Sequence, residues 1–439
     1  MRVNIIHPGA GELRYEIRGI VKFAQKLART GIDITWENIG DPVAKGEEVP
    51  QWVRDIVAEK VQQSSSYAYS PTKGLLDTRK FLADRRTQET GVKLSADNII
   101  FFNGLGDAVT KLYTWLHPRA RVLGPNPAYP THSSIEGAHG RSPMLTYKLD
   151  PAKGWLPDVE DVRNMVKYNP SITALLIINP DNPTGMVYPR EILEEFAALA
   201  REYDLFLIAD EIYSGLAFPD SGFVSMAEVA GDLPTIVMRG LSKEIPWPGS
   251  RCGWLEFYNT EKDEAFARYA QSIEEAKMIE VCSTTLPQAV LPAIMGDERY
   301  PDHLAARQAH YAQRAQEAAT ILGSQPALDV VTPKGAFYLP VTFSEEFMQK
   351  PFVLPAASPE AQALLDAELA NIPEDDPGSG SGTSFDKRFC YQLMAATGIC
   401  TVPLSTGFNS YIPGFRMTLL EADDATFTRT LQTIVSVLG

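Results

Sequence analysis

The sequence predicts an α/β protein in which a mostly parallel sheet lies between helices, with a smaller α+β unit beside it. Three observations predict this class. Strand-like and helix-like segments alternate through the middle of the chain, the strands are apolar on both faces, and long helical stretches follow after about residue 260. Strands that are apolar on both faces are typical of parallel sheets covered by helices. With 44% hydrophobic residues, the 439-residue chain can bury a core of this size.

The expected elements follow in order along the chain. Each strand is a short apolar or β-branched run, and each helix has apolar residues spaced three or four apart. Gly, Pro or Asn follows several of these strands and predicts where they stop. The expected strands are 99–102, 121–123, 173–178, 205–209 and 235–238. The expected helices are 107–116, 191–203, 263–281, 303–321 and 361–370.

Two domains are expected from the change of pattern along the chain. The large domain covers 50–300, and the small domain combines 1–49 with 301–439. Within the small domain, residues 345–388 form an insertion. Its segment 372–384 is rich in Gly, Ser and Asp and has no apolar periodicity, which predicts a mobile surface insertion rather than a domain boundary.

Composition excludes several functional classes. The chain has 55 acidic and 40 basic side chains, a net charge of −15, which disfavours binding to nucleic acid or to an anionic membrane surface. Four cysteines without a CxxC spacing predict neither a disulfide framework nor a zinc site, and the six histidines include no HExxH pair. The first residues lack the apolar core of a signal peptide. We therefore expect a cytoplasmic protein that binds no metal.

Four motifs carry the chemistry. They are NPDNPTG at 179–185, ADEIY at 209–213, LSK at 241–243 followed by PGSRCGW, and GFRMT at 414–418. Each of the first three follows or ends an expected strand. Because ligands of parallel α/β sheets collect beyond the carboxyl ends of the strands, these motifs are expected to meet there.

This order of motifs resembles the fold type I pyridoxal-phosphate enzymes, and specifically the class I and II aminotransferases. The resemblance extends from Tyr15 to the final helix and leaves out the insertion. It implies pyridoxal 5'-phosphate as cofactor, an L-amino acid and a 2-oxo acid as substrates, and a homodimer with shared active sites. Residues 15–19 and 397–403 resemble alanine aminotransferases in particular.

The resemblance assigns a role to each residue around the cofactor ring. Lys243 would hold the cofactor covalently and shuttle protons. Asp210 would keep the pyridine nitrogen protonated, although taken alone it also fits a helix N-cap. Asn182 and Tyr213 would hydrogen-bond the phenolic oxygen of the ring, and Tyr129 would stack on its face.

The resemblance also places the cofactor phosphate. Leu105 and Gly106 open a helix whose backbone N–H groups would bind it, together with the Arg251 guanidinium. The family often has a serine where this chain has Gly240, so one expected hydroxyl is missing. Ser242 would replace it in part.

Substrate recognition depends on a further set of residues. Arg416 would bind the substrate α-carboxylate as a two-pronged donor, and Gly40 would let the backbone approach the same group. Arg18 is a candidate for the distal carboxylate of glutamate, with Ile17 limiting side-chain size; a helix-capping or surface ion pair is the alternative for Arg18. Tyr69 matches the tyrosine that the family sends across the dimer interface to the phosphate.

The expected reaction is transamination between alanine and 2-oxoglutarate. Aspartate, aromatic or sulfur amino acids remain open as substrates, as does a pyridoxal-phosphate lyase of the same fold. A nicotinamide-dependent dehydrogenase is disfavoured, because the glycine pair at 104 and 106 lacks the third glycine of a dinucleotide fingerprint. A transcription regulator is also disfavoured, because the sequence opens directly with the aminotransferase-like segment and the chain is strongly acidic.

Overall fold

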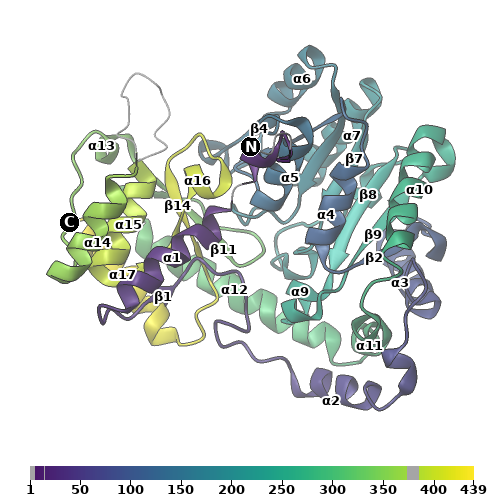
Figure 1. Cartoon of the computed structure of the whole chain (residues 1–439), viewed down its shortest axis with the longest axis horizontal. Helices are drawn as coiled ribbons and strands as arrows, with labels where there is room; N and C mark the ends of the chain where they lie inside the picture. Colours follow the sequence, from purple (N-terminus) through teal and green to yellow (C-terminus); the bar gives the residue numbers. More distant parts are fainter. Residues whose placement is uncertain (1–4, 14, 373–384) are drawn as a thin grey trace.

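In a computed structural model of the protein, residues 5–13, 15–372 and 385–439 are described. A large sheet and a smaller one lie in two adjoining units, and helices cover both (Figure 1). The large sheet is mixed and mostly parallel, whereas the smaller one is antiparallel. The α/β class predicted from the sequence is therefore confirmed. No helix in the described ranges is both long and apolar enough to cross a membrane.

Within the described residues, the large sheet has eight strands. Their spatial order is β2 (Ile99–Phe102), β9 (Gly253–Tyr258), β8 (Thr235–Gly240), β7 (Phe206–Asp210), β6 (Ile172–Ile178), β3 (Arg121–Asn126), β4 (Thr146–Asp150) and β5 (Leu156–Pro157). The strands from β8 to β4 run parallel, and β9 is antiparallel to both of its neighbours. The loops after β6, β7 and β8 therefore leave the same edge of the sheet.

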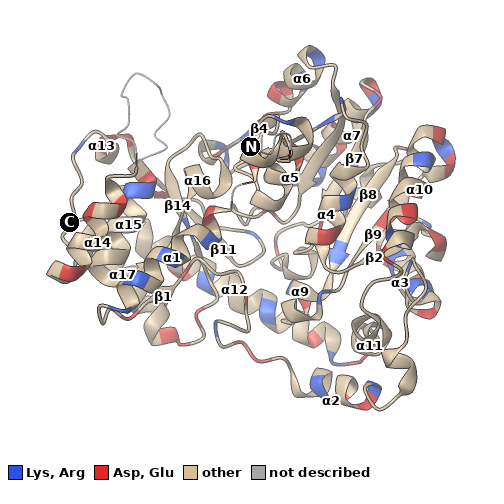
Figure 2. Cartoon of the chain, viewed as in Figure 1, with Lys and Arg blue, Asp and Glu red and all other residues tan. Residues whose placement is uncertain are grey.

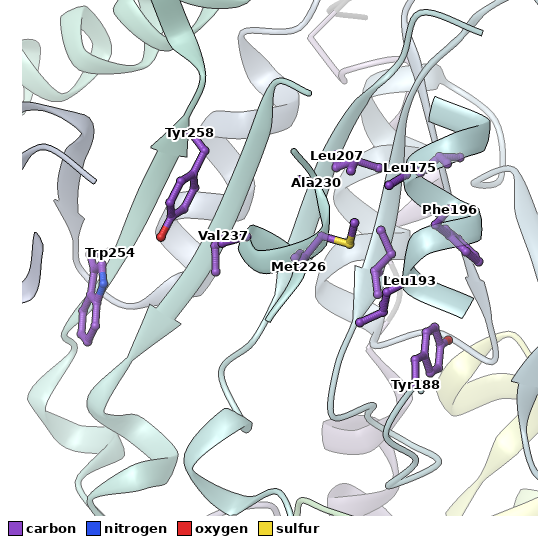
Figure 3. Packing of buried hydrophobic residues seen from close by; sticks show 14 of the residues in the cluster. Leu175, Tyr188, Leu193, Phe196, Leu207, Met226, Ala230, Val237, Trp254 and Tyr258 are labelled. Atoms are coloured by element: carbon purple, nitrogen blue, oxygen red, sulfur yellow. The ribbon is translucent and has the colours of Figure 1, made fainter. Parts of the chain in front are cut away.

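Helices pack on both faces of this sheet because its strands are apolar on both sides. The helices of this unit are α2 (Gln51–Lys60), α3 (Leu76–Thr90), α4 (Leu105–Thr114), α5 (Pro130–Gly140), α6 (Val159–Tyr168), α7 (Arg190–Glu202), α8 (Met226–Val229), α9 (Leu241–Glu244), α10 (Glu264–Ile279) and α11 (Thr285–Met295). Along β6, Leu175 and Ile177 enter a core with α7, part of which Figure 3 shows. Leu176 and Ile178 enter the core of the opposite face, with α4 and α10. Charged residues gather on the outer helices (Figure 2).

The smaller sheet has its own core. Its strand order is β10 (Leu328–Val330), β11 (Tyr338–Phe343), β14 (Gly414–Thr418) and β13 (Val402–Pro403), and β1 (Thr35–Trp36) pairs separately with β12 (Ile399–Cys400). The helices of this unit are α1 (Glu16–Ala28), α12 (Tyr300–Leu322), α13 (Glu345–Met348), α14 (Pro359–Leu369), α15 (Phe385–Thr397), α16 (Leu404–Phe408) and α17 (Asp424–Val437). Helix α12 joins the two units, because Tyr300 lies in the core of the large sheet and Tyr311 in that of the smaller.

Each predicted strand and helix has a counterpart in the structure, with one informative difference. The strand expected at 121–123 continues through Gly124 and Pro125 to Asn126. Beyond Leu123 this strand pairs with β4 alone, so the missing N–H of the proline is tolerated there. The helix predicted at 361–370 corresponds to α14. Residues 373–384, within the segment predicted to be mobile, lie outside the described residues, and the proposed domain limits remain a prediction.

A buried ion network lies directly behind two of the strand ends. Arg239 in β8 donates from Nη2 to Glu244 Oε1 at 2.9 Å, and its Nη1 lies 3.8 Å from Glu211 Oε2. All three side chains are buried. Glu211 directly follows Asp210, and Glu244 directly follows Lys243. The network therefore fixes the backbone at both positions.

We predict that Arg239→Met lowers the free energy of unfolding by about 3–5 kcal/mol, because the buried Glu244 carboxylate loses its cation and Glu211 retains only Arg86. Chemical denaturation followed by circular dichroism measures this. Arg190→Met is the matched control: its half-exposed side chain pairs with Glu194 and Glu228 on the surface, and its loss should cost less than about 1 kcal/mol. Equal losses in the two variants would contradict the role given to the buried network.

Candidate active site

One cavity of about 960 Å³ lies where the parallel strands end, and residues of α1, β11 and β14 of the smaller unit also line it. Most of the residues singled out in the sequence line it. These are Ile17, Arg18, Gly40, Leu105, Gly106, Tyr129, Asn182, Asp210, Tyr213, Ser242, Lys243, Arg251 and Arg416. Tyr69 does not line the cavity, and it is 83% exposed.

Lys243 lies in α9, directly after β8, with its amine in the cavity. Its Nζ donates to the Gly40 carbonyl oxygen at 2.6 Å and lies 5.3 Å from the Phe337 ring centre. Burial lowers the pKa of this amine to about 8. A substantial fraction of the amine is therefore neutral, and nucleophilic, at a pH where an exposed lysine remains protonated.

Asp210 ends β7, the neighbouring strand, and is buried. Its Oδ2 lies 3.0 Å from Nε2 of His132, and its Oδ1 accepts from the Ile212 backbone N–H at 3.2 Å. His132 Nδ1 in turn lies 3.3 Å from the Tyr113 hydroxyl. Asp210 is not an N-cap of any described helix. A buried carboxylate held in this way can stabilise a positive charge placed beside it.

The amino end of α4 forms an anion cradle beside Arg251. Gly104, the residue before the helix, has a φ of +81°, and a Cβ there would lie 2.2 Å from Arg251 Nη2. Glycine is therefore required for Arg251 to approach the first turn, where Leu105 and Gly106 begin the helix. N–H groups of a first helical turn, together with a guanidinium, suit a phosphate group.

The structure explains the glycine found where a serine hydroxyl was expected. A Cβ at Gly240 would lie 2.8 Å from the Cys252 carbonyl oxygen in the adjacent chain segment. Any side chain at this position would push the adjoining backbone away. Ser242 lines the cavity two residues later.

Arg416 is fully buried in β14 and reaches the cavity from the smaller unit. Its Nη1 donates to Asn182 Oδ1 at 3.2 Å, and its Nη2 donates to the Asn38 carbonyl oxygen at 2.6 Å. Its Nε has no hydrogen-bond partner, and in the described part of the chain the guanidinium forms no ion pair. Burial lowers its pKa. A buried guanidinium with unused donors is suited to bind a carboxylate.

Helix α1 supplies the wall nearest the N-terminus. Arg18 and Lys22 both line the cavity, one turn apart, and Ile17 is buried beside them. Within the described ranges neither Arg18 nor Lys22 forms an ion pair. The surface ion pair that was the alternative for Arg18 is therefore not observed.

Sequence reasoning missed Lys22 and two further residues that support this site. His132 supports Asp210 from α5, and Tyr338 in β11 lies 2.8 Å, hydroxyl to hydroxyl, from Tyr213. Their partners are 78 and 125 residues away in the sequence. No local pattern predicts contacts at that separation.

Comparison with known proteins identifies the relatives of the chain. The model of the family "Aminotransferase class I and II" matches residues 37–406. An uncharacterized aminotransferase of Methanocaldococcus jannaschii is 48% identical over 97% of this chain and 96% of its own length. An alanine aminotransferase of Mycobacterium bovis is 31% identical over 74% of this chain and 75% of its own. The solved alanine aminotransferase of Pyrococcus furiosus superposes with a TM-score of 0.84 at 24% identity, covering 100% and 99% of the two chains.

Proposed function

Since the chain belongs to the class I and II aminotransferase family, we propose that it uses pyridoxal 5'-phosphate to move an amino group between L-alanine and 2-oxoglutarate. The observation that carries this proposal is a single cavity lined by the Lys243 amine, the Asp210 carboxylate and the Arg416 guanidinium. The alanine aminotransferase among the relatives favours alanine as donor. The more similar relative is named an uncharacterized aminotransferase and favours no substrate.

The cavity residues fit this cofactor. The half-buried Lys243 amine has the lowered pKa that a covalent attachment needs, and the cradle at α4 with Arg251 suits the phosphate. Asp210 would face the pyridine nitrogen, while Asn182 and Tyr213 would bind the phenolic oxygen. Tyr129 would stack on the ring, and its hydroxyl lies 3.3 Å from that of Tyr15.

The chain's own residues then perform the proton transfers. When bound, the cofactor supplies an electron sink for the carbanion formed at the substrate Cα. Lys243 removes the proton from Cα as a general base. The same amine then donates a proton to the cofactor carbon. Asp210, held by His132, keeps a proton at the ring nitrogen. Arg416 binds the α-carboxylate and so orients the Cα–H bond toward Lys243.

The cationic side chains of α1 that line the cavity favour a dicarboxylate, 2-oxoglutarate, as the amino-group acceptor. Arg18 and Lys22 place two cations without an ion pair, within the part of the chain that is described, on the same face of the cavity. We propose that Arg18 binds the distal carboxylate of 2-oxoglutarate and glutamate. Ile17 would limit the size of the side chain, which favours alanine as the second substrate.

A homodimer is favoured by an exposed apolar patch beside the anion cradle. Its residues are Tyr67, Tyr69, Met278, Ile279 and Val281, each at least 50% exposed. The two segments are adjacent, since Thr72 Oγ1 donates to the Val281 carbonyl oxygen at 3.2 Å. Asn103, just before the cradle, accepts from the Thr284 N–H at 3.0 Å. A second copy covering this patch would bring the two phosphate sites close to the interface. Tyr69 of each copy would then reach the phosphate site of the other copy.

The first test is the half-reaction. Adding L-alanine alone to protein loaded with pyridoxal phosphate should bleach its visible absorbance and release one pyruvate per active site. Lys243→Ala should abolish turnover without changing the circular dichroism spectrum, because it removes the amine that would hold the cofactor and act as the base. Normal turnover in Lys243→Ala would refute the mechanism, and bleaching by aspartate or aromatic amino acids alone would refute alanine as donor.

The second test separates the two arginines. Arg18→Met should raise the KM for 2-oxoglutarate about tenfold and leave the KM for pyruvate unchanged, since only the dicarboxylate loses a charged partner. Arg416→Met should lower kcat/KM at least about tenfold for both. Arg29→Met, at the exposed end of the same helix and outside the cavity, is the control for Arg18. Equal effects of Arg18→Met on both oxo acids would assign Arg18 to structure.

The third test concerns assembly. Sedimentation should show a dimer for the wild type and a monomer for Ile279→Asp, because a buried charge would prevent association. Val353→Asp changes an 80% exposed apolar residue outside the patch and should remain dimeric. A monomeric wild-type protein that turns over alanine would exclude the shared active site.

A further inference from the structure

Tyr338 lies where the two halves of the cavity meet. It begins β11, it is buried, and it lines the cavity. Its ring lies under the guanidinium of Arg416, with 4.3 Å between Arg416 Cζ and the ring centre. Its hydroxyl lies 2.8 Å from that of Tyr213. One side chain therefore contacts both the carboxylate-binding arginine and the tyrosine assigned to the cofactor.

We propose that Tyr338 is a positioning residue with two separable functions. Its ring holds the guanidinium of Arg416 in place, and its hydroxyl directs the proton of Tyr213 toward the cofactor. The inference rests on the proposed function, because it names what sets the geometry of that same site.

The ring function follows from how Arg416 is confined. A second aromatic ring, that of Phe408, also contacts the guanidinium, with 5.0 Å between Cζ and its ring centre. Its two hydrogen bonds, to Asn182 and Asn38, fix it only at the Nη atoms. Contact with the electron-rich ring faces holds the plane of the guanidinium, whose buried Nε has no hydrogen-bond partner within the protein. Without the Tyr338 ring, the guanidinium can rotate out of this plane.

The hydroxyl function follows from the crowding around it. A Cβ on Gly40 would lie 2.2 Å from the Tyr338 hydroxyl oxygen, so the glycine makes room for this group. Two hydroxyls 2.8 Å apart share one hydrogen, and either can donate. If Tyr213 donates to the phenolic oxygen of the cofactor, Tyr338 must be the donor of the pair. A donor to Tyr213 polarises its O–H bond and strengthens the hydrogen bond that Tyr213 makes in turn.

The two functions are separated by Tyr338→Phe and Tyr338→Leu. Phenylalanine keeps the ring and removes the hydroxyl, whereas leucine removes both. Each variant is loaded with pyridoxal phosphate, and its visible spectrum is titrated with pH alongside measurements of KM and kcat. Tyr147→Phe removes a buried hydroxyl that donates to the Leu176 carbonyl, outside the cavity, and controls for loss of a buried hydrogen bond.

Tyr338→Phe should raise the apparent pKa of the visible chromophore, because a weaker hydrogen bond from Tyr213 stabilises the deprotonated form less. Its KM values should stay within about threefold of the wild type, since the ring contact remains. Tyr338→Leu should show the same rise and should also raise KM for alanine and 2-oxoglutarate about tenfold alike. Tyr147→Phe should match the wild type in both measurements.

Two results would overturn the inference. A Tyr338→Phe titration identical to the wild type would remove the hydroxyl function, and wild-type KM values in Tyr338→Leu would remove the ring function. A wild-type protein that gains no visible band with pyridoxal phosphate would overturn the proposed function itself. If the wild-type protein is active and both Tyr338 variants behave like it in the titration and in KM, only this inference would be overturned.

Discussion

The charge pairing of Arg239 with Glu211 and Glu244 is the constraint on which the rest of the site depends. Arg239 is one cation beside two carboxylates, and Arg86 supplies a second buried cation 3.7 Å from Glu211, so that the buried charges compensate one another. Each glutamate is covalently next to a functional residue, Asp210 in one case and Lys243 in the other. Lys243 and Asp210, for which we propose the roles of base and ring partner, are therefore positioned by an interaction that neither of them makes.

The second half of the site comes from the smaller unit and is joined to the first by several polar contacts in the cavity, among them those of Lys243 with Gly40 and of Tyr213 with Tyr338. Arg416 donates to Asn182, which lies in the loop after β6 of the large sheet. Helix α12 connects the two cores away from this contact. The residues proposed to bind the substrate carboxylate and the cofactor thus come from different units, and the cavity lies where those units are docked.

Much of the fold and part of the site could be predicted from the sequence. The buried strands and the residues that end them are local patterns, which is why Asp210, Lys243 and Asn182 could be expected at one edge of a sheet. His132, Tyr338 and Arg239 could not, because each acts through a tertiary contact between side chains that lie on different elements. The extension of β3 through Pro125 also depended on which neighbouring strand it pairs with, and the local sequence does not indicate this neighbour.

The cavity has the opposite charge to the protein that surrounds it. Its lining carries five cationic side chains and two carboxylates, on a chain of net charge −15. The cationic residues are Arg18, Lys22, Lys243, Arg251 and Arg416. At physiological ionic strength the surface repulsion decays over about 8 Å, whereas the low-dielectric walls concentrate the field inside the cavity. The acidic surface therefore repels an anionic metabolite at a distance, whereas the cationic lining attracts it at the mouth of the cavity. This attraction favours anions before any specific contact forms.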